Sequence, residues 1–276
     1  GCESLIWNSA VNDLDLSNVQ NIDFMFSKCT LFNQNLNSWD TTLVSQMVNL
    51  FKNATTFNGD INLWDVSNVQ SMSGMFNGAT SFNTNINLWD VSNALFMSNM
   101  FKGATSFNQP LDEWDMSNTI FCENMFKGAT SFNQPLNDWV VSGIVFFQGF
   151  MDGATSFNQD LNSWNTNMAT TKNMFKDAES FNGNISNWDV SNVNEFNGMF
   201  KGATSFNGDL SSWVLEGQAD DGPGGGELTL NSMFEDSNYN QSLNAWDTSN
   251  VVSMSNMFAN NTTFNQPLDS WDTSNV

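Results

Sequence analysis

Residues 64–88 read WDVSNVQSMSGMFNGATSFNTNINL, and the next 25 residues, 89–113, read WDVSNALFMSNMFKGATSFNQPLDE. The two segments agree at most positions, from the opening Trp-Asp-Val-Ser-Asn to the later Gly-Ala-Thr-Ser-Phe-Asn. Self-similarity at a fixed period of this length indicates a solenoid, in which each unit buries its apolar face only against its neighbours. The repeat therefore decides the fold, and it directs the search for function to the outer surface.

Tryptophan marks the register of the repeat along the chain. The marker residues are Trp39, Trp64, Trp89, Trp114, Trp139, Trp164, Trp188, Trp213, Trp246 and Trp271. Their steps are 25 residues, except for one of 24 and one of 33 that contains the Gly- and acid-rich segment 214–227. A segment of that composition predicts a surface loop. We expect one solenoid domain over 1–276, with a partial or capping segment at 1–13, regular repeats at 14–213, the loop at 214–227, and final repeats at 228–276 that end in mid-unit.

Two spacings within each unit suggest its local structure. Small or apolar side chains recur at steps of three and four, as at Ala94, Met97, Met100, Phe101 and Ala104. This is the period of one face of a short helix or 3₁₀ segment. Further along, Leu111, Trp114 and Met116 end in the alternation of a short strand. We therefore expect one short strand and one short helix or 3₁₀ segment in each coil, with the strands of successive coils stacked in parallel.

Charge and composition exclude several classes of function. The 276 residues carry 29 acidic side chains, seven lysines, no arginine and no histidine, for a net charge of −22. Binding to nucleic acid or to an anionic membrane surface needs clustered basic groups, so neither partner is expected. No stretch is apolar and long enough to predict insertion into a membrane.

The absence of histidine also excludes the common catalytic pairs. A Ser-His-Asp triad, a Cys-His pair and a histidine metal site all need this residue. The remaining carboxylates belong to columns repeated along the chain, whereas a catalytic site is a unique constellation. We therefore expect a protein that is not an enzyme and that has no catalytic or cofactor-binding residues, with calcium as the one open case.

An aspartate follows most of the marker tryptophans. This column contains Asp15, Asp40, Asp65, Asp90, Asp115, Asp189, Asp247 and Asp272. On a strand it points away from the buried side, and its carboxylates can accept backbone N–H groups from the Ser-Asn pair that follows. The second interpretation is a calcium ladder in which Asp40, Asp65, Asp90, Asp115, Asp189, Asp247 and Asp272 bridge successive coils, because carboxylates are suitable calcium ligands.

An asparagine follows an aromatic residue in every unit. The column contains Asn33, Asn58, Asn83, Asn108, Asn133, Asn158, Asn182, Asn207, Asn240 and Asn265. An amide side chain offers both donors and an acceptor, so a stacked column predicts a structural ladder between coils. Sequons for glycosylation occur at Asn53, Asn184, Asn240, Asn260 and Asn261, and they acquire sugar only in a protein that a eukaryote secretes.

Three cysteines leave the redox state open. Cys29 and Cys122 replace Ala and Met in repeat columns, so both are expected to be small core residues. Cys2 precedes the first full unit, and a Cys2–Cys29 disulfide that closes the first coil is the alternative.

The consensus W-D-V-S-N-V-x-x-M-x-x-M-F-x-G-A-T-S-F-N resembles the 25-residue repeat of BspA-like leucine-rich-repeat (LRR) surface proteins, over residues 14–276. The resemblance implies an LRR-type solenoid, export to the cell surface, and roles in adhesion or surface coats. The expected fold class is thus an α/β repeat solenoid, an LRR-like right-handed coil of about ten turns. The unit at Trp139 departs from the pattern, with Val140 and Gly143 replacing Asp and Asn.

The leading functional prediction is a non-enzymatic extracellular or cell-surface protein for structure or adhesion, which assembles end to end into filaments or a coat. The alternative is a module that binds glycans or proteins through its repeated strand face or through the loop at 214–227. Expected partners are other copies of the chain, surface proteins or glycans. Nucleic acid binding and direct membrane insertion are not expected.

Overall fold

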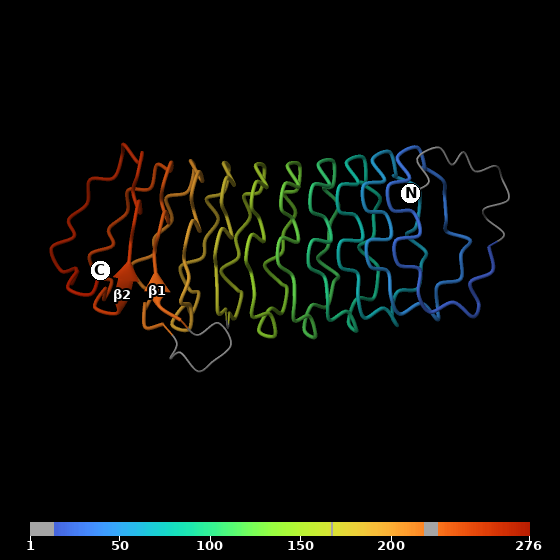
Figure 1. Ribbon diagram of the computed structural model, residues 1–276, viewed down its shortest axis with the longest axis horizontal. Helices are drawn as coiled ribbons and strands as arrows, with labels where there is room; N and C mark the ends of the chain where they lie inside the picture. The colour runs from blue at the N-terminus through green and yellow to red at the C-terminus, as the bar shows by residue number, and fades with distance from the viewer. Residues whose placement is uncertain (1–13, 167, 218–225) are drawn as a thin grey trace.

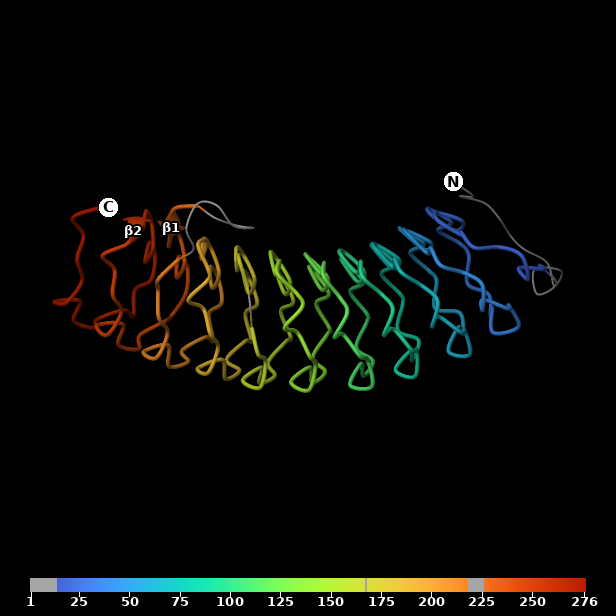
Figure 2. The same ribbon diagram turned by 90° about the horizontal axis from the view of Figure 1, so that it is seen from below.

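The computed structural model describes residues 14–166, 168–217 and 226–276. The chain winds into coils that stack side by side from the N-terminal to the C-terminal end (Figure 1). Turned by 90°, the stack is a curved rod with a concave and a convex side (Figure 2). The two strands, β1 (Leu228–Thr229) and β2 (Val251–Ser253), lie in neighbouring coils on the concave side and pair in parallel.

Single parallel bridges continue this pairing through the rest of the stack. One residue per coil takes part, and the column runs through Asn21, Gln46, Ser71, Phe96, Phe121, Phe146, Thr170, Glu195 and Thr229. The step of 24 residues falls between Phe146 and Thr170, and the insertion falls between Glu195 and Thr229, yet both pairs remain in register. The bridged column is therefore continuous across the irregular units, and because it leads to β1 it lies on the concave side.

The expectation of a helix and a strand in each LRR-like coil is wrong. Among the described residues there is no helix, and β1 and β2 are the two strands. Residues 111–116, where alternation predicted a strand, are outside the pairing column, which crosses that coil at Phe121. The segment expected to be helical is a series of tight turns.

Backbone conformation explains why the helical spacing does not make a helix. Asn99 has φ of 61° and Gly103 has φ of 68°, and the equivalent residues of the other coils are also left-handed. An α-helix cannot pass through left-handed residues four positions apart, since every one of its residues is right-handed. Asn, Asp and Gly hold most of these positions because they tolerate that region best.

The backbone N–H groups of this segment bond alternately to the next coil and to their own. Asn99, Phe101 and Gly103 donate to carbonyls of the following coil at 2.9, 2.9 and 2.7 Å. The residues between them donate three positions back, as Lys102 does to the carbonyl of Asn99 at 3.2 Å. Alternate N–H groups therefore join coils, and the others donate three positions back. None donates four positions back, as the N–H groups of an α-helix do.

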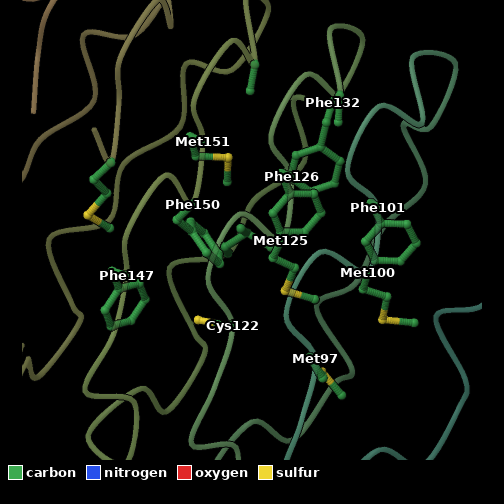
Figure 3. Packing of buried hydrophobic residues seen from close by; sticks show 14 of the residues in the cluster. Met97, Met100, Phe101, Cys122, Met125, Phe126, Phe132, Phe147, Phe150 and Met151 are labelled. Carbon is green, nitrogen blue, oxygen red and sulfur yellow. The ribbon is translucent and has the colours of Figure 1, made fainter. Parts of the chain in front are cut away.

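The core is a set of stacked columns. Trp64 and Trp89 are parallel within 4° with centroids 6.3 Å apart, and the indole Nε1 of Trp89 donates to the carbonyl of Ile61 at 3.2 Å. Phe101 stacks on Phe126 in the same way at 5.4 Å. Figure 3 shows these phenylalanines with Met97, Met100 and Met125 beside them. Burial of such large side chains in every coil supplies the apolar area that holds the stack together.

One core position breaks the column. The unit with Phe150 before Met151 reverses the usual Met-Phe order, and the ring of Phe150 meets that of Phe126 at 84° (Figure 3). Its neighbour Phe147 is also edge-on to it, at 73°. The reversed order places Phe150 at the backbone position that carries Met in other units. Its ring therefore reaches the phenylalanine column from a different direction and lies edge-on.

Candidate interaction surface

The concave side carries a local apolar stripe. In three successive coils the bridged residue is phenylalanine, and an aliphatic residue precedes it. We call these six residues, Leu95, Phe96, Ile120, Phe121, Val145 and Phe146, the phenylalanine stripe. Phe96 is 41% exposed and Ile120 is 39% exposed, while the other four are half-buried. Contiguous apolar area at the surface is a feature of interaction sites.

The three rings form a ladder on the surface of the stack. The centroids of Phe96 and Phe121 are 5.4 Å apart with planes at 8°, and those of Phe121 and Phe146 are 6.1 Å apart at 7°. The rings lie parallel and close to one another. The stripe therefore presents mainly ring edges and aliphatic side chains to a partner.

The fold does not require apolar residues at these positions. The equivalent pairs in other coils are Gln20-Asn21, Ser45-Gln46, Gln70-Ser71, Ala169-Thr170 and Asn194-Glu195. These coils keep the same bridges with a polar residue at the bridged position, and so does the coil with Leu228-Thr229. The stripe is thus a departure confined to three coils, and stability of the stack gives no reason for it.

Hollows lie at both ends of the stripe. One of about 540 Å³ is lined by Phe146, Thr170, Glu195, Gly226 and Glu227 among others. The second, of about 460 Å³, is lined by Leu95 together with Asn68, Gln70, Asn93 and Asn118. The stripe therefore continues into a hollow of mixed character at its Phe146 end, and it is bounded by amide side chains at its Leu95 end.

Acidic side chains accompany the stripe. Glu123 lies in the same coil as Phe121 and accepts a hydrogen bond from the hydroxyl of Ser98. Glu195, two coils beyond Phe146, is paired with Lys172 at 2.8 Å. Glu227 lines the adjacent hollow without an ion pair in the described part of the chain. The local charge has the sign of the whole protein.

The aspartate column lies elsewhere on the coil surface, and every member is exposed. Each of its carboxylates accepts the backbone N–H of the residue two positions later, as Asp115 does from Ser117 at 2.9 Å. A hydrogen bond from the hydroxyl of Ser117 lowers the pKa of Asp115 most, and the bond from the Ser117 N–H lowers it further. Hydrogen bonds from residue i+2 lower the pKa of Asp15, Asp40, Asp189, Asp247 and Asp272 in the same way.

The calcium-ladder positions are thus engaged in turns. Within residues 14–166, 168–217 and 226–276, no three His, Cys, Asp or Glu side chains form a group that could hold a metal ion. The calcium ladder remains a prediction for a direct test.

The asparagine column forms a continuous hydrogen-bonded ladder. From Asn33 to Asn265, each Oδ1 accepts the backbone N–H of the asparagine in the next coil, at 2.7–2.9 Å. These amides are occupied by contacts between coils, so they are not available as a row for ligands.

The sequon asparagines differ in accessibility. Asn184 and Asn260 are exposed, whereas Asn53, Asn240 and Asn261 are half-buried. Asn240 also belongs to the ladder and accepts the N–H of Asn265. Asn261 donates to the carbonyl of Tyr239 at 3.0 Å. A sugar at either of these two positions would compete with a bond between coils.

The cysteine and loop predictions fall partly outside the described residues. Cys29 and Cys122 are buried, and burial raises the pKa of the Cys122 thiol. Cys2 lies outside the described residues, as do residues 218–225 of the predicted loop. Residues 214–217 and 226–227 are described, and Gly226 and Glu227 face the larger hollow at the stripe.

A family model described as "Mycoplasma protein of unknown function, DUF285" matches residues 2–96, 60–164, 138–221 and 228–276. The first three matches overlap because the repeated unit can be aligned in more than one register. No curated protein matches the chain. In the described part of the structure, no helix could cross a membrane.

Proposed function

Since this chain belongs to the DUF285 family, described as Mycoplasma proteins of unknown function, we propose that it is a non-enzymatic repeat protein that binds a partner protein through its concave side. The phenylalanine stripe is the observation that carries this proposal. The curvature of a repeat stack creates an extended concave surface of the kind that repeat proteins use for binding. An apolar stripe on that surface, dispensable for the stack, fits a site kept for contact with another molecule.

A location at the cell surface or outside the cell is part of the proposal. It rests on the resemblance of the repeat to BspA-like surface proteins. A net charge of −22 keeps an extended, repetitive protein soluble and separate from nucleic acid. The protein would act there in adhesion or as a structural component.

A protein partner is favoured over a glycan. Sugars bind aromatic residues by stacking on open ring faces, and the parallel rings of Phe96, Phe121 and Phe146, at 5.4 and 6.1 Å, leave little room for a sugar between them. The stripe offers apolar edges instead, which suit the side chains of a protein.

End-to-end assembly is a second proposal, because coils of this kind stack on one another through matching columns, and the last described coil illustrates the contact. A hollow of about 610 Å³ there is lined by apolar residues that include Met257, Phe258, Leu268 and Trp271. Throughout the stack, the equivalent residues are covered by the next coil. A further coil of the same kind, from the same polypeptide or from another copy, would fit this end.

The proposed function is tested by locating the protein and by measuring its binding. Antibody labelling of intact and permeabilised source cells should give equal signals if the protein is at the surface. The purified chain should then bind members of a panel of matrix proteins in preference to a glycan array. Replacement of the three phenylalanines by threonine should remove this binding. Label restricted to permeabilised cells, or binding that the replacement leaves intact, would contradict the proposal.

A further inference from the structure

We propose that the phenylalanine stripe is the docking site of an amphipathic α-helix from a partner protein, with lysine or arginine flanking the apolar side of that helix. The inference rests on the proposed function and names the chemistry of the partner. Three observations carry it: the spacing of the rings, the engagement of the backbone beneath them, and the charge around them.

The ring spacing matches the pitch of an α-helix. The rings follow one another at 5.4 and 6.1 Å along the stack. An α-helix advances about 5.4 Å in each turn, so its residues i, i+4 and i+7 would meet three successive coils. Leu95, Ile120 and Val145 widen the stripe on one side, which suits an apolar helix face more than a single row of side chains.

The backbone under the stripe is already used within the stack. Phe121 donates its N–H to the carbonyl of Leu95 at 3.3 Å and accepts from Met97 at 2.8 Å. Phe96 likewise donates to the carbonyl of Gln70 at 3.2 Å. A partner therefore cannot add to this face as a β-strand, because strand addition needs unpaired backbone groups. A partner must therefore bind through side chains. An α-helix can do so because its backbone groups are already hydrogen-bonded within the helix.

The acidic groups near the stripe favour a partner helix with basic residues beside its apolar face. Glu123 and Glu227 border the stripe and its hollow, and the protein as a whole carries −22. A second copy that docked on this stripe would place acidic groups against acidic groups, which disfavours that particular pairing. Basic residues beside the apolar face would be attracted and would orient the helix as it docks.

A designed peptide tests the inference. The probe is a fluorescein-labelled helix of about 18 residues, five turns, with Leu at i, i+4, i+7 and i+11 and Lys on the remaining faces. Its binding to the full chain is followed by fluorescence anisotropy at an ionic strength of about 0.15 M. We expect saturable binding, and we expect the Phe96→Thr/Phe121→Thr/Phe146→Thr variant to bind about tenfold more weakly or worse. Threonine is the replacement because Thr170 and Thr229 occupy the same column in other coils.

Two controls separate the stripe from general attraction. The Leu63→Ser/Leu88→Ser variant removes leucines that are 73% and 85% exposed elsewhere, and it should bind as the wild type does. A peptide of the same composition, with its leucines dispersed around the helix, should bind about tenfold more weakly than the probe. If the triple variant loses its cooperative thermal transition, Phe96→Thr alone replaces it, because this ring is at the end of the ladder.

Equal binding by the triple variant, or equal binding of the dispersed peptide, would overturn the inference. Sedimentation that shows a dimer of the chain, lost in the triple variant, would assign the stripe to a second copy and would also overturn it. Surface location and partner binding are measured independently. If matrix proteins bind through the stripe while the probe does not, the helix inference fails alone, and the proposed function stands.

Discussion

The side-chain oxygen of Asn108 accepts the backbone N–H of Asn133 at 2.9 Å, across the gap between two coils. The same oxygen accepts Nε2 of Gln134 at 2.9 Å. One amide therefore satisfies two donors of the next coil. The backbone contact repeats along the ladder, and the glutamine contact recurs at Gln109, Gln159 and Gln266.

The first prediction concerns this contact. Asn108→Ala should lower the free energy of unfolding by about 1–2 kcal/mol, because it leaves partly buried donors without an acceptor. Urea unfolding followed by tryptophan fluorescence measures the change. Asn108→Asp keeps the acceptor and should retain most of the stability. Asn250→Ala is the control, since this exposed amide makes no hydrogen bond within the described residues. Equal stability of the Asn108 and Asn250 alanine variants would argue against a structural ladder.

The second prediction concerns the hydroxyl of Tyr239. This residue takes the place of phenylalanine in the aromatic column, and its buried oxygen has no hydrogen-bond partner among the residues that the structure describes. Burial of the phenol, and to a lesser degree Asp209, raises its pKa. Tyr239→Phe removes an unsatisfied polar group and should raise the free energy of unfolding by about 1–2 kcal/mol. The reverse change, Phe206→Tyr, should lower it. A less stable Tyr239→Phe protein would show that the hydroxyl has a partner in solution.

The third prediction is a pH dependence at the aspartate turns. Hydrogen bonds from Ser117 hold the pKa of Asp115 below its ordinary value of 3.8. The folded state thus binds the proton less readily than the unfolded state. The stabilisation is present above the ordinary value, and it is lost as pH falls through the lowered pKa. Asp115→Ala should therefore destabilise the protein at neutral pH, and its difference from the wild type should shrink towards about pH 2. Asp115→Asn keeps an acceptor without titration. A difference that stays constant with pH would contradict the prediction.

The fourth prediction separates the two interpretations of the aspartate column. In Asp65, Asp90 and Asp115, Oδ1 already accepts a hydrogen bond from the following serine. We expect calcium at about 1 mM, within the range of weak extracellular sites, to leave the thermal midpoint unchanged relative to magnesium. A calcium-specific rise that the Asp65→Asn/Asp90→Asn/Asp115→Asn variant abolishes would assign the bridging ladder instead.

The sequence alone predicts the register of the coils and the buried columns. Trp89, Met100 and Phe101 recur at fixed positions with no polar substitute, and all three are buried. A strict column of large apolar residues has one physical explanation in a repeat, which is contact with the same column in the next unit.

The phenylalanine stripe has a weaker signal in the sequence. Phe96, Phe121 and Phe146 occupy a column that is polar in other units, so the departure is visible once the column is aligned. Their exposure and their ring stacking are not visible there, because an apolar residue in a repeat is equally compatible with the core. Which side of the coil they face depends on the folded backbone, whose left-handed turns the helical spacing does not reveal.

Those turns are also why the helix was predicted wrongly. Apolar residues at steps of three and four suit a helix, but the same steps arise when left-handed residues recur four positions apart. The signal that distinguishes the two is Asn or Gly at both positions, as at Asn99 and Gly103 or Gly74 and Gly78. In a helix these residues would be costly, whereas in a left-handed turn they are the best available.

A substitution at Gly103 therefore decides between the two conformations. In a helix, Gly103→Ala would stabilise the protein by about 1 kcal/mol. At φ of 68° the new Cβ instead puts the residue in a region that costs about 1–2 kcal/mol. No atom lies close enough to clash, since the nearest is 3.8 Å away, so the backbone effect is measured alone. We expect a lower urea midpoint for Gly103→Ala and little change for Lys102→Ala, because Lys102 itself is not left-handed. A higher urea midpoint for Gly103→Ala would instead support a helical conformation at this position.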